Sequence, residues 1–566
     1  MKRADAVGET RPDPGTSPDQ REYVIGALIA AVALGLAIPI HYFAWGVHNA
    51  IGFDDGYTIA LAQRVIDGRW LPYVDGLSHR GPLLYWATAV SLVLTEPLSW
   101  TGPRALTIIC FFVAATGCFT AGAAARRPIA GALAALFYVF AICVALHPYD
   151  ALSLTGEKVS APFCMASLTL AALGVVRARS TRSRVLTLGL AGVSSALAGL
   201  AKQTALVLVL PIALWSALAA FDRHGSSARQ RWLEACAIPA GWTVACTLAL
   251  LPYAVSGNLA AFRYWFFEYN ARIYMEPYPA SAIVPLTAIW WNGNRWAWLI
   301  AATLVVTLIA RGLRRLVNAR RQSVPWWSAP GFEFWTAAST LAGLVSSAAA
   351  LRYWPHYFIA VLTYVGLTLG LSIDALLRTR SRARRLVALL VTAVTLVGVA
   401  AVGVLSRSTA MLLERQSGEW AAAEPEPICD FVRRHSTATD KIFIWGFDGD
   451  LYVTCKRRPA TSFTYLTFVA GLVPPFWGER REKRVVPGAP ERLAAELRAG
   501  LPPVILDAPQ RLGGVSVRSV PVVNSVLQDL YCPGPTLEGR EGRQVQAYVL
   551  RKQSSCPDNY ANAHGT

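Results

Sequence analysis

The chain has 566 residues, of which 54% are hydrophobic and only 16% are charged. This balance is unusual for a soluble enzyme and ordinary for a protein that crosses a membrane several times. The formal net charge of +18 does not indicate a nucleic-acid partner, because the arginines form short clusters between apolar segments, as in cytoplasmic loops. We therefore expect a polytopic membrane protein without a nucleic-acid partner.

The N-terminal residues 1–21 are polar, proline-rich and of mixed charge, so they predict a disordered cytoplasmic tail. The apolar segment 23–44 is long enough to span a membrane and no small-residue cleavage site follows it, which indicates an anchor and not a removed signal peptide. Further candidate spans lie at 104–125, 128–147, 159–176, 185–201, 204–221, 233–254, 296–312, 331–350, 356–377 and 386–405. The expected fold is therefore a polytopic α-helical membrane domain over 22–405 with about 11 transmembrane helices.

The apolar piece 82–97 is short and interrupted, and it decides the topology. If it crossed the membrane, every later arginine cluster would lie outside the cell. If it lies in the interface, each cluster lies inside, as the positive-inside rule requires. We therefore expect a surface helix at 82–97, a cytoplasmic N-terminus and an external C-terminus. The cytoplasmic side then carries little except arginine and serine.

The first external loop, 45–103, has an unusual order of charges. It opens with Asp54 and Asp55 and closes with His79 and Arg80, and a short amphipathic piece at 57–66 lies between the two pairs. Acids at a membrane surface that face a cationic patch suit the handling of a sugar on a phosphate-bearing lipid.

Most other unusual polar residues also fall on the outer side under this topology. They are Glu157, Lys202, Glu268, Arg272, Arg352 and His356. Lys202 lies at the outer end of an apolar span with only Gln203 as a polar neighbour. A charge in such a place usually has a partner or a ligand.

The C-terminal region changes in character and predicts a small α/β domain at 406–552, on the periplasmic face, followed by a flexible tail at 553–566. Helical stretches lie near 419–435 and 490–499, and short apolar runs at 441–445, 504–506 and 545–550 predict strands. The ten cysteines show no zinc-site spacing. If the region is external, a Cys532–Cys556 disulfide is one option.

The first loop resembles that of a known enzyme class. The residues that carry the resemblance are Asp54-Asp55-Gly56-Tyr57, Ala60, Gly68, Pro72-Tyr73, Asp75 and Arg80-Gly81-Pro82-Leu83-Leu84-Tyr85. They are similar to the first external loop of polyprenyl-phosphate-sugar-dependent glycosyltransferases of the GT-C fold, related to protein O-mannosyltransferases and the lipid A aminoarabinose transferase. The chain departs mildly from that pattern, with Asp55 where glutamate is usual and Arg80-Gly81-Pro82 where Lys-Pro-Pro is frequent. Glu157, the AGLAKQ segment 198–203 and the RYWPHYF segment 352–358 give supporting matches.

The resemblance implies a role for each candidate residue. Asp54 is the expected general base, and Asp55 supports it or joins Glu157 in binding a divalent cation such as Mg²⁺ or Mn²⁺. The expected ligands of the donor phosphate are His79, Arg80, Lys202, Arg352 and His356. The expected contacts with the acceptor or sugar are Tyr57, Glu268 and Arg272.

Plainer interpretations stay open for the same residues. The aspartate pair is also suited to capping a helix that starts near Tyr57, and Glu157 to pairing with Lys158. Arg80 and Arg352 suit lipid headgroups at span ends. The aromatic segment 263–279 suits an interfacial belt.

The function that the resemblance implies is glycosyl transfer in the bacterial inner membrane. A sugar would pass with inversion from a polyprenyl-phosphate donor to a lipid, glycan or protein acceptor at the periplasmic face. The alternative is a transporter or flippase that moves a lipid-linked sugar without glycosyl transfer. The absence of an internal hydropathy repeat and the concentration of acids on one side favour the transferase.

Overall fold

The computed structural model describes residues 20–47, 53–146, 153–223, 225–274, 331–348, 355–378, 426–472, 482–539 and 542–551, besides four isolated helical positions. The expected N-terminal tail, the spans at 296–312 and 386–405 and the residue Arg352 lie wholly or largely outside these ranges.

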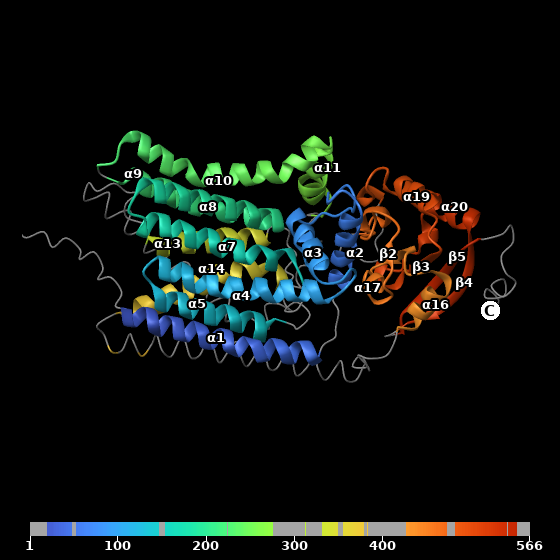
Figure 1. Cartoon of the computed structure of the whole chain (residues 1–566), viewed down its shortest axis with the longest axis horizontal. Coiled ribbons are helices and arrows are strands. Elements are labelled where there is room, and N and C mark those ends of the chain that lie inside the picture. The colour runs from blue at the N-terminus through green and yellow to red at the C-terminus, as the bar shows by residue number, and fades with distance from the viewer. Residues whose placement is uncertain are drawn as a thin grey trace, which may run out of the picture.

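Long helices run side by side and form a bundle with a small sheet at one end (Figure 1). They are α1 (Gln20–Val47), α4 (Thr101–Ala124), α5 (Pro128–Phe140), α7 (Gly156–Ala172), α8 (Thr181–Ala201), α9 (Val209–Phe221), α10 (Ala228–Val255), α13 (Phe332–Ala348) and α14 (Ile359–Leu377). Short turns of other helix types extend four of them: η1 (Ala141–Ala145), η2 (Leu173–Arg177), η3 (Gln203–Leu208) and η7 (Pro355–Phe358). Within the described residues, seven helices combine the length and apolar composition needed to cross a membrane. The expected count of about eleven is not confirmed.

Small residues allow the bundle helices to approach closely. A Cβ atom added at Gly241 of α10 would lie 1.9 Å from the carbonyl oxygen of Gly189 in α8, and one added at Gly370 of α14 would lie 2.1 Å from that of Ala130 in α5. In a membrane, where lipid tails are as apolar as leucine, such backbone contact is the main source of helix association.

Ion pairs join helices at the end of the bundle away from the sheet. Buried Glu234 accepts from both Arg184 and Arg223, and Arg127 bonds Glu333 and Asp374 at 3.4 Å each. Arg378 bonds Asp374 at 2.9 Å and Glu22 at 2.8 Å. The expectation that this side carries little except arginine and serine is wrong, because four acids lie here and neutralise arginines of the predicted cytoplasmic clusters. Removing one partner would leave a buried charge, which costs about 3–5 kcal/mol.

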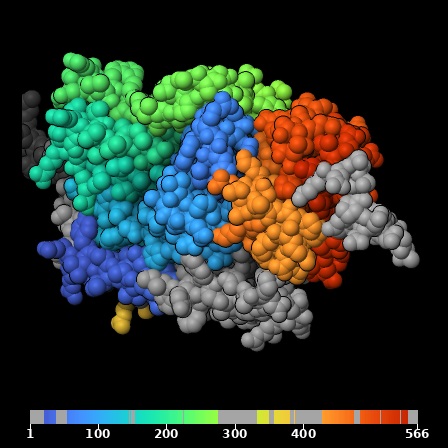
Figure 2. Space-filling view, turned by 45° about the vertical axis from the view of Figure 1, so that its right-hand side comes forward, coloured from blue at the N-terminus to red at the C-terminus, as the bar shows by residue number. Residues whose placement is uncertain are grey.

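The first loop forms two short helices, α2 (Phe53–Asp67) and α3 (Pro82–Leu94), between the bundle and the sheet (Figures 1 and 2). The expected surface helix at 82–97 corresponds to α3. The amphipathic piece 57–66 lies in α2, and both its faces are covered because the C-terminal region packs on the side away from the bundle. After α10 the chain continues through α11 (Leu259–Arg263), η4 (Tyr264–Glu268) and η5 (Asn270–Tyr274).

The C-terminal region forms a five-stranded sheet in the order β2-β1-β3-β5-β4. The strands are β1 (Lys441–Gly446), β2 (Arg458–Pro459), β3 (Val504–Ala508), β4 (Tyr531–Glu538) and β5 (Gln544–Leu550). Strand β1 runs parallel to β2 and β3, with Phe443 opposite Ile505, whereas β5 is antiparallel to β3 and β4. The apolar runs of β1 and β3 are buried on both faces, as expected of central parallel strands.

Helices surround this sheet: α16 (Pro427–His435), α17 (Asp450–Thr454), α18 (Thr467–Ala470), α19 (Ala489–Gly500) and α20 (Pro521–Leu530), with single turns η8 (Glu482–Arg484), η9 (Gln510–Leu512) and η10 (Val517–Ser519). The strands expected at 441–445, 504–506 and 545–550 coincide with β1, β3 and β5. Two of the expected helical stretches correspond to α16 and α19, whereas β2, β4 and α20 were not foreseen.

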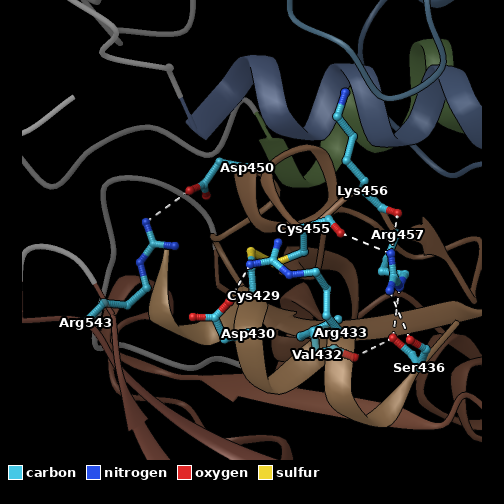
Figure 3. The surroundings of a disulfide bond; sticks show 10 residues. All are labelled: Cys429, Asp430, Val432, Arg433, Ser436, Asp450, Cys455, Lys456, Arg457 and Arg543. Carbon is cyan, nitrogen blue, oxygen red and sulfur yellow. Dashed lines mark hydrogen bonds and ion pairs between the residues drawn. A yellow bond between two sulfur atoms is a disulfide. The ribbon is translucent and has the colours of Figure 1, made fainter. Parts of the chain in front are cut away.

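A disulfide joins Cys429 of α16 to Cys455, which follows α17 (Figure 3). Its surroundings are held by charged contacts: Arg457 bonds the Ser436 hydroxyl, and Arg543 bonds Asp450 at 3.1 Å and Asp448 at 3.2 Å. The disulfide that the sequence suggested, Cys532–Cys556, is a separate one, and this one was not foreseen. Cys532 is itself disulfide-bonded, and its proposed partner Cys556 lies outside the described residues.

The start of α2 lies against the β1–α17 turn. A Cβ atom added at Gly56 would lie 2.2 Å from the backbone nitrogen of Asp450, and one at Gly449 would lie 2.7 Å from the Tyr57 ring. The Tyr57 hydroxyl donates to the Gly446 carbonyl at 2.9 Å. At the other end of α2, Asp67 pairs with Arg458 at 3.3 Å. The helix is therefore fixed to the sheet along its length.

Gly56→Ala should separate α2 from the sheet, because the added methyl group meets a backbone atom that cannot rotate away. We expect a clear fall in the thermal unfolding midpoint of the detergent-purified protein and faster proteolysis between the bundle and the sheet. Gly35→Ala in α1 is the matched control, since no atom lies within 4 Å of its added methyl group and alanine favours a helix. Equal midpoints for the two variants would contradict the close contact at Gly56.

Candidate functional site

An ion pair between Asp54 and Arg80 lies at the end of the bundle nearest the sheet. Asp54 belongs to the first turn of α2, where the helix N-terminus favours a negative charge, and Arg80 lies just before α3. Arg80 Nη2 donates to Asp54 Oδ1 at 2.7 Å, and the two side chains are 21% and 19% exposed. Burial lowers the pKa of Arg80, but Asp54 beside it outweighs that effect and holds the pKa above its usual range.

Hydrogen bonds fix the backbone around Arg80. The Tyr73 hydroxyl donates to the Arg80 carbonyl at 2.6 Å, and the Arg80 N–H donates to Ser78 Oγ at 3.1 Å. Thr58 donates its hydroxyl to the Asp54 carbonyl at 2.9 Å. The carboxylate and guanidinium are thus held by their own segments as well as by each other. Among the described residues, no donor contacts Asp54 Oδ2.

Asp55, the neighbour of Asp54 in the sequence, bonds a different part of the chain. Its Oδ1 accepts from the Leu154 N–H at 2.6 Å. Burial raises the pKa of Asp55 to about 7, the Leu154 N–H and nearby Lys158 act in the opposite direction, and Asp54 adds to the increase. Asp55 therefore joins the first outer loop to the second.

A second ion pair joins Glu157 to Lys202 at 2.7 Å. Glu157 lies in the first turn of α7 and is 3% exposed, and Lys202 follows α8 directly. Lys202 also lies over the Tyr357 ring at 4.4 Å, and His356 lies within electrostatic range of Glu157. The alternative that Glu157 pairs with Lys158 is wrong, because Lys158 donates instead to the Ser153 carbonyl at 2.6 Å.

Backbone contacts bring the two ion pairs together. A Cβ atom added at Gly81 would lie 2.2 Å from the Leu200 carbonyl oxygen, and one added at Gly156 would lie 2.7 Å from that of Ala201. The residues that make these contacts are next in the sequence to Arg80, Glu157 and Lys202. Three segments that are far apart in the chain thus meet at the end of α8.

His79 lies in an aromatic cluster and not on an open surface. Its ring centroid is 4.2 Å from that of Tyr274 and 5.3 Å from that of Tyr465. Its carbonyl accepts from Gln203 at 3.0 Å and from Asn270 at 2.7 Å. This position gives His79 a packing role beside Arg80, and a contact with a donor phosphate stays a prediction.

Of the expected acceptor residues, only Tyr57 lies close to Asp54, one turn later in α2. Tyr57 is buried and its hydroxyl bonds Gly446. Glu268 pairs with Arg263 at 2.8 Å and with Arg272 at 3.9 Å, and both arginines are largely exposed. No described contact joins Glu268 or Arg272 to Asp54. Three residues of the aromatic segment 263–279 belong to the core, since Trp265, Phe266 and Tyr269 are buried in one cluster with residues of the C-terminal region.

The described residues do not fit the expected metal site. Glu157 is engaged by Lys202 and Asp55 by Leu154. No group of three or more histidine, cysteine, aspartate or glutamate side chains suited to a metal ion occurs in the part of the chain that the structure describes. A shared site for Mg²⁺ or Mn²⁺ on Asp55 and Glu157 stays a prediction, and no reaction step below uses it.

Tyr465 and Tyr274 are neighbours of the site that sequence reasoning missed. Tyr465 comes from the C-terminal region, and the Tyr274 hydroxyl bonds that of Tyr357 at 2.7 Å. These rings join the surroundings of Lys202 to those of Arg80. A tyrosine among other aromatic residues gives no signal in one sequence, because only long-range packing brings it to the site.

Comparisons with known proteins found similar folds and no similar sequences. No family model and no curated protein matches the chain. The crystal structure of ArnT from Cupriavidus metallidurans bound to undecaprenyl phosphate is 15% identical, over 91% of this chain and 97% of that one, with a TM-score of 0.53. Its apo form gives 15% identity, the same coverage and a TM-score of 0.52. The oligosaccharyltransferase of Archaeoglobus fulgidus, tethered to an acceptor peptide, is 14% identical over 94% of this chain and 75% of that one, with a TM-score of 0.44, and no argument rests on it. The chain thus has the GT-C fold that its first loop predicted.

Asp55 should make stability depend on pH. Its pKa is raised from 3.8 to about 7, so the folded state keeps a proton that the unfolded state loses. The stability from this group is full below about pH 4 and is lost as pH rises through about 7. Thermal unfolding from pH 4.5 to 8 should show a steeper fall for the wild type than for Asp55→Asn, whose amide oxygen still accepts from Leu154. Asp430→Asn, in an exposed pair, should keep the wild-type slope. If Asp55→Asn also keeps it, the assignment is wrong.

Proposed function

We propose that the chain is a membrane glycosyltransferase that takes a sugar from a polyprenyl-phosphate donor and transfers it to an acceptor at the external face of the membrane. The observation that carries the proposal is the meeting of two carboxylate–cation pairs, Asp54–Arg80 and Glu157–Lys202, at one end of an apolar bundle. The cations suit the phosphate of a lipid at the membrane surface. The carboxylates suit the activation of a hydroxyl nucleophile. The fold shared with ArnT, which was crystallised with undecaprenyl phosphate, supports it.

Asp54 is suited to act as the general base. Arg80 bonds Oδ1 and leaves Oδ2 available to accept the proton of an acceptor hydroxyl. The acceptor oxygen attacks the anomeric carbon from the face opposite the phosphate, a new C–O bond forms, and the sugar–phosphate bond breaks with inversion. The electron pair leaves with the polyprenyl phosphate, and the proton stays on Asp54.

Arg80 and Lys202 are suited to stabilise the departing phosphate. Each already has a carboxylate partner, but an ammonium carries three donor hydrogens and a guanidinium five, so both keep donors for phosphate oxygens. Their partners hold them in place before the donor binds, which lowers the cost of ordering long side chains. His356, within electrostatic range of Glu157, and Arg352, outside the described residues, complete the proposed cationic set.

The disulfide and the arginine clusters support the same orientation. Disulfides such as Cys429–Cys455 persist in oxidising compartments, whereas arginine clusters favour the cytoplasm. We therefore assign the C-terminal unit, 406–552, to the periplasmic side of a bacterial inner membrane and the N-terminus to the cytoplasm. The membrane unit is 22–405.

Asp54→Asn should abolish transfer, with a loss of at least about 100-fold, because positioned general bases contribute about 10²–10⁴-fold. The variant should reach the membrane at the wild-type level, and the assay is sugar transfer from polyprenyl-phosphate donors in the full-length protein. Asp529→Asn, in an exposed pair with Arg498, should leave the rate unchanged.

Two outcomes would contradict the proposal. Full activity of Asp54→Asn would remove Asp54 as the base. A wild type that moves the lipid-linked sugar across vesicle bilayers and forms no glycosidic bond would establish the transporter alternative instead.

A further inference from the structure

Tyr465 of the C-terminal region packs against residues that flank the Asp54–Arg80 pair in the sequence. Its ring centroid is 5.6 Å from that of Tyr57, one turn of α2 after Asp54, and 5.3 Å from that of His79, the neighbour of Arg80. Arg80 and Asp54 both act electrostatically on its hydroxyl. A segment remote in sequence from the first loop thus reaches the centre of the candidate site.

Other aromatic rings hold Tyr465 in place. Phe447 and Phe468 each lie 5.4 Å from it, centroid to centroid, and with Tyr57 and His79 they leave the residue 8% exposed. The contacts with Tyr57 and Phe447 are edge-on, an arrangement that aromatic pairs prefer. The position of the hydroxyl is therefore fixed before any ligand binds.

The hydroxyl of Tyr465 differs from those of three buried tyrosines in or against the first loop. Buried tyrosine hydroxyls usually find a partner, and these three do: Tyr57 bonds Gly446, Tyr73 bonds Arg80 and Tyr253 bonds Pro72. Among the described residues, no donor or acceptor bonds the Tyr465 hydroxyl. A tyrosine held by its ring contacts next to Tyr57 and His79, with a hydroxyl that bonds no described residue, is expected of a group that a ligand completes.

We propose that Tyr465 is a substrate-binding residue whose hydroxyl bonds an oxygen of the sugar-phosphate donor beside Asp54 and Arg80. The inference rests on the proposed function and extends it, because it makes the C-terminal region part of the reaction site. The oxygen belongs either to the phosphate or to a sugar hydroxyl, and both offer the same hydrogen-bonding chemistry.

The test is Tyr465→Phe in the full-length protein, which removes only the hydroxyl and keeps the ring contacts. Tyr531→Phe is the matched control, because the Tyr531 hydroxyl likewise bonds no described residue but belongs to the first residue of β4. We expect Tyr465→Phe to keep the wild-type unfolding midpoint and to lose about tenfold in kcat/KM for the donor, the effect of about 1.4 kcal/mol. Tyr531→Phe should match the wild type in both measurements.

Binding of undecaprenyl phosphate identifies the oxygen. Weaker binding by Tyr465→Phe would assign the contact to the phosphate, and unchanged binding with reduced transfer would assign it to a sugar hydroxyl. Wild-type behaviour of Tyr465→Phe in both assays, or an equal loss in Tyr531→Phe, would overturn the inference. A wild type that transfers no sugar would refute the proposed function by itself. In that case the binding of undecaprenyl phosphate alone would test the Tyr465 contact. Equal affinities of the wild type and Tyr465→Phe would then overturn the inference.

Discussion

The candidate site depends on the close backbone contact of the first outer loop with its neighbours on two sides. At Gly56 the loop meets the β1–α17 turn, and at Gly81 it meets the end of α8, in both places at a distance that leaves no room for a side chain. These contacts fix Asp54 and Arg80 relative to Lys202 and Tyr465, which come from the bundle and the C-terminal region. A carboxylate and its cations can act on one substrate only when their separation is set in this way.

Ion pairs occur at both ends of the bundle, but the two ends use them differently. At the arginine-rich end, acids such as Glu234 and Asp374 are almost fully buried and join helices. At the end facing the sheet, Asp54 and Lys202 stay about one-fifth exposed and keep bonding capacity that their partners do not use. The first arrangement stabilises the fold, whereas the second leaves room for a charged ligand.

The sequence predicted most helices, the central strands and the charged residues at their ends, because apolar periodicity and arginine clusters are local signals. It also identified Asp54, Arg80, Glu157 and Lys202, which the structure brings together. It could not predict their pairing, since Glu157 bonds Lys202 and not its neighbour Lys158. Tyr57 and His79, which were expected to bind substrate, are buried by the sheet and the aromatic cluster, and their binding roles stay predictions. Tyr465 was missed for the same reason, because packing between distant segments leaves no local pattern.

The most direct test of the account is a cryo-EM structure of the full-length protein in lipid nanodiscs with undecaprenyl phosphate. We expect density for the phosphate within hydrogen-bonding distance of Arg80 or Lys202, with Asp54 facing the space beside it. Phosphate density at the arginine-rich end of the bundle, or none near either residue at saturating lipid, would contradict the assignment of this site.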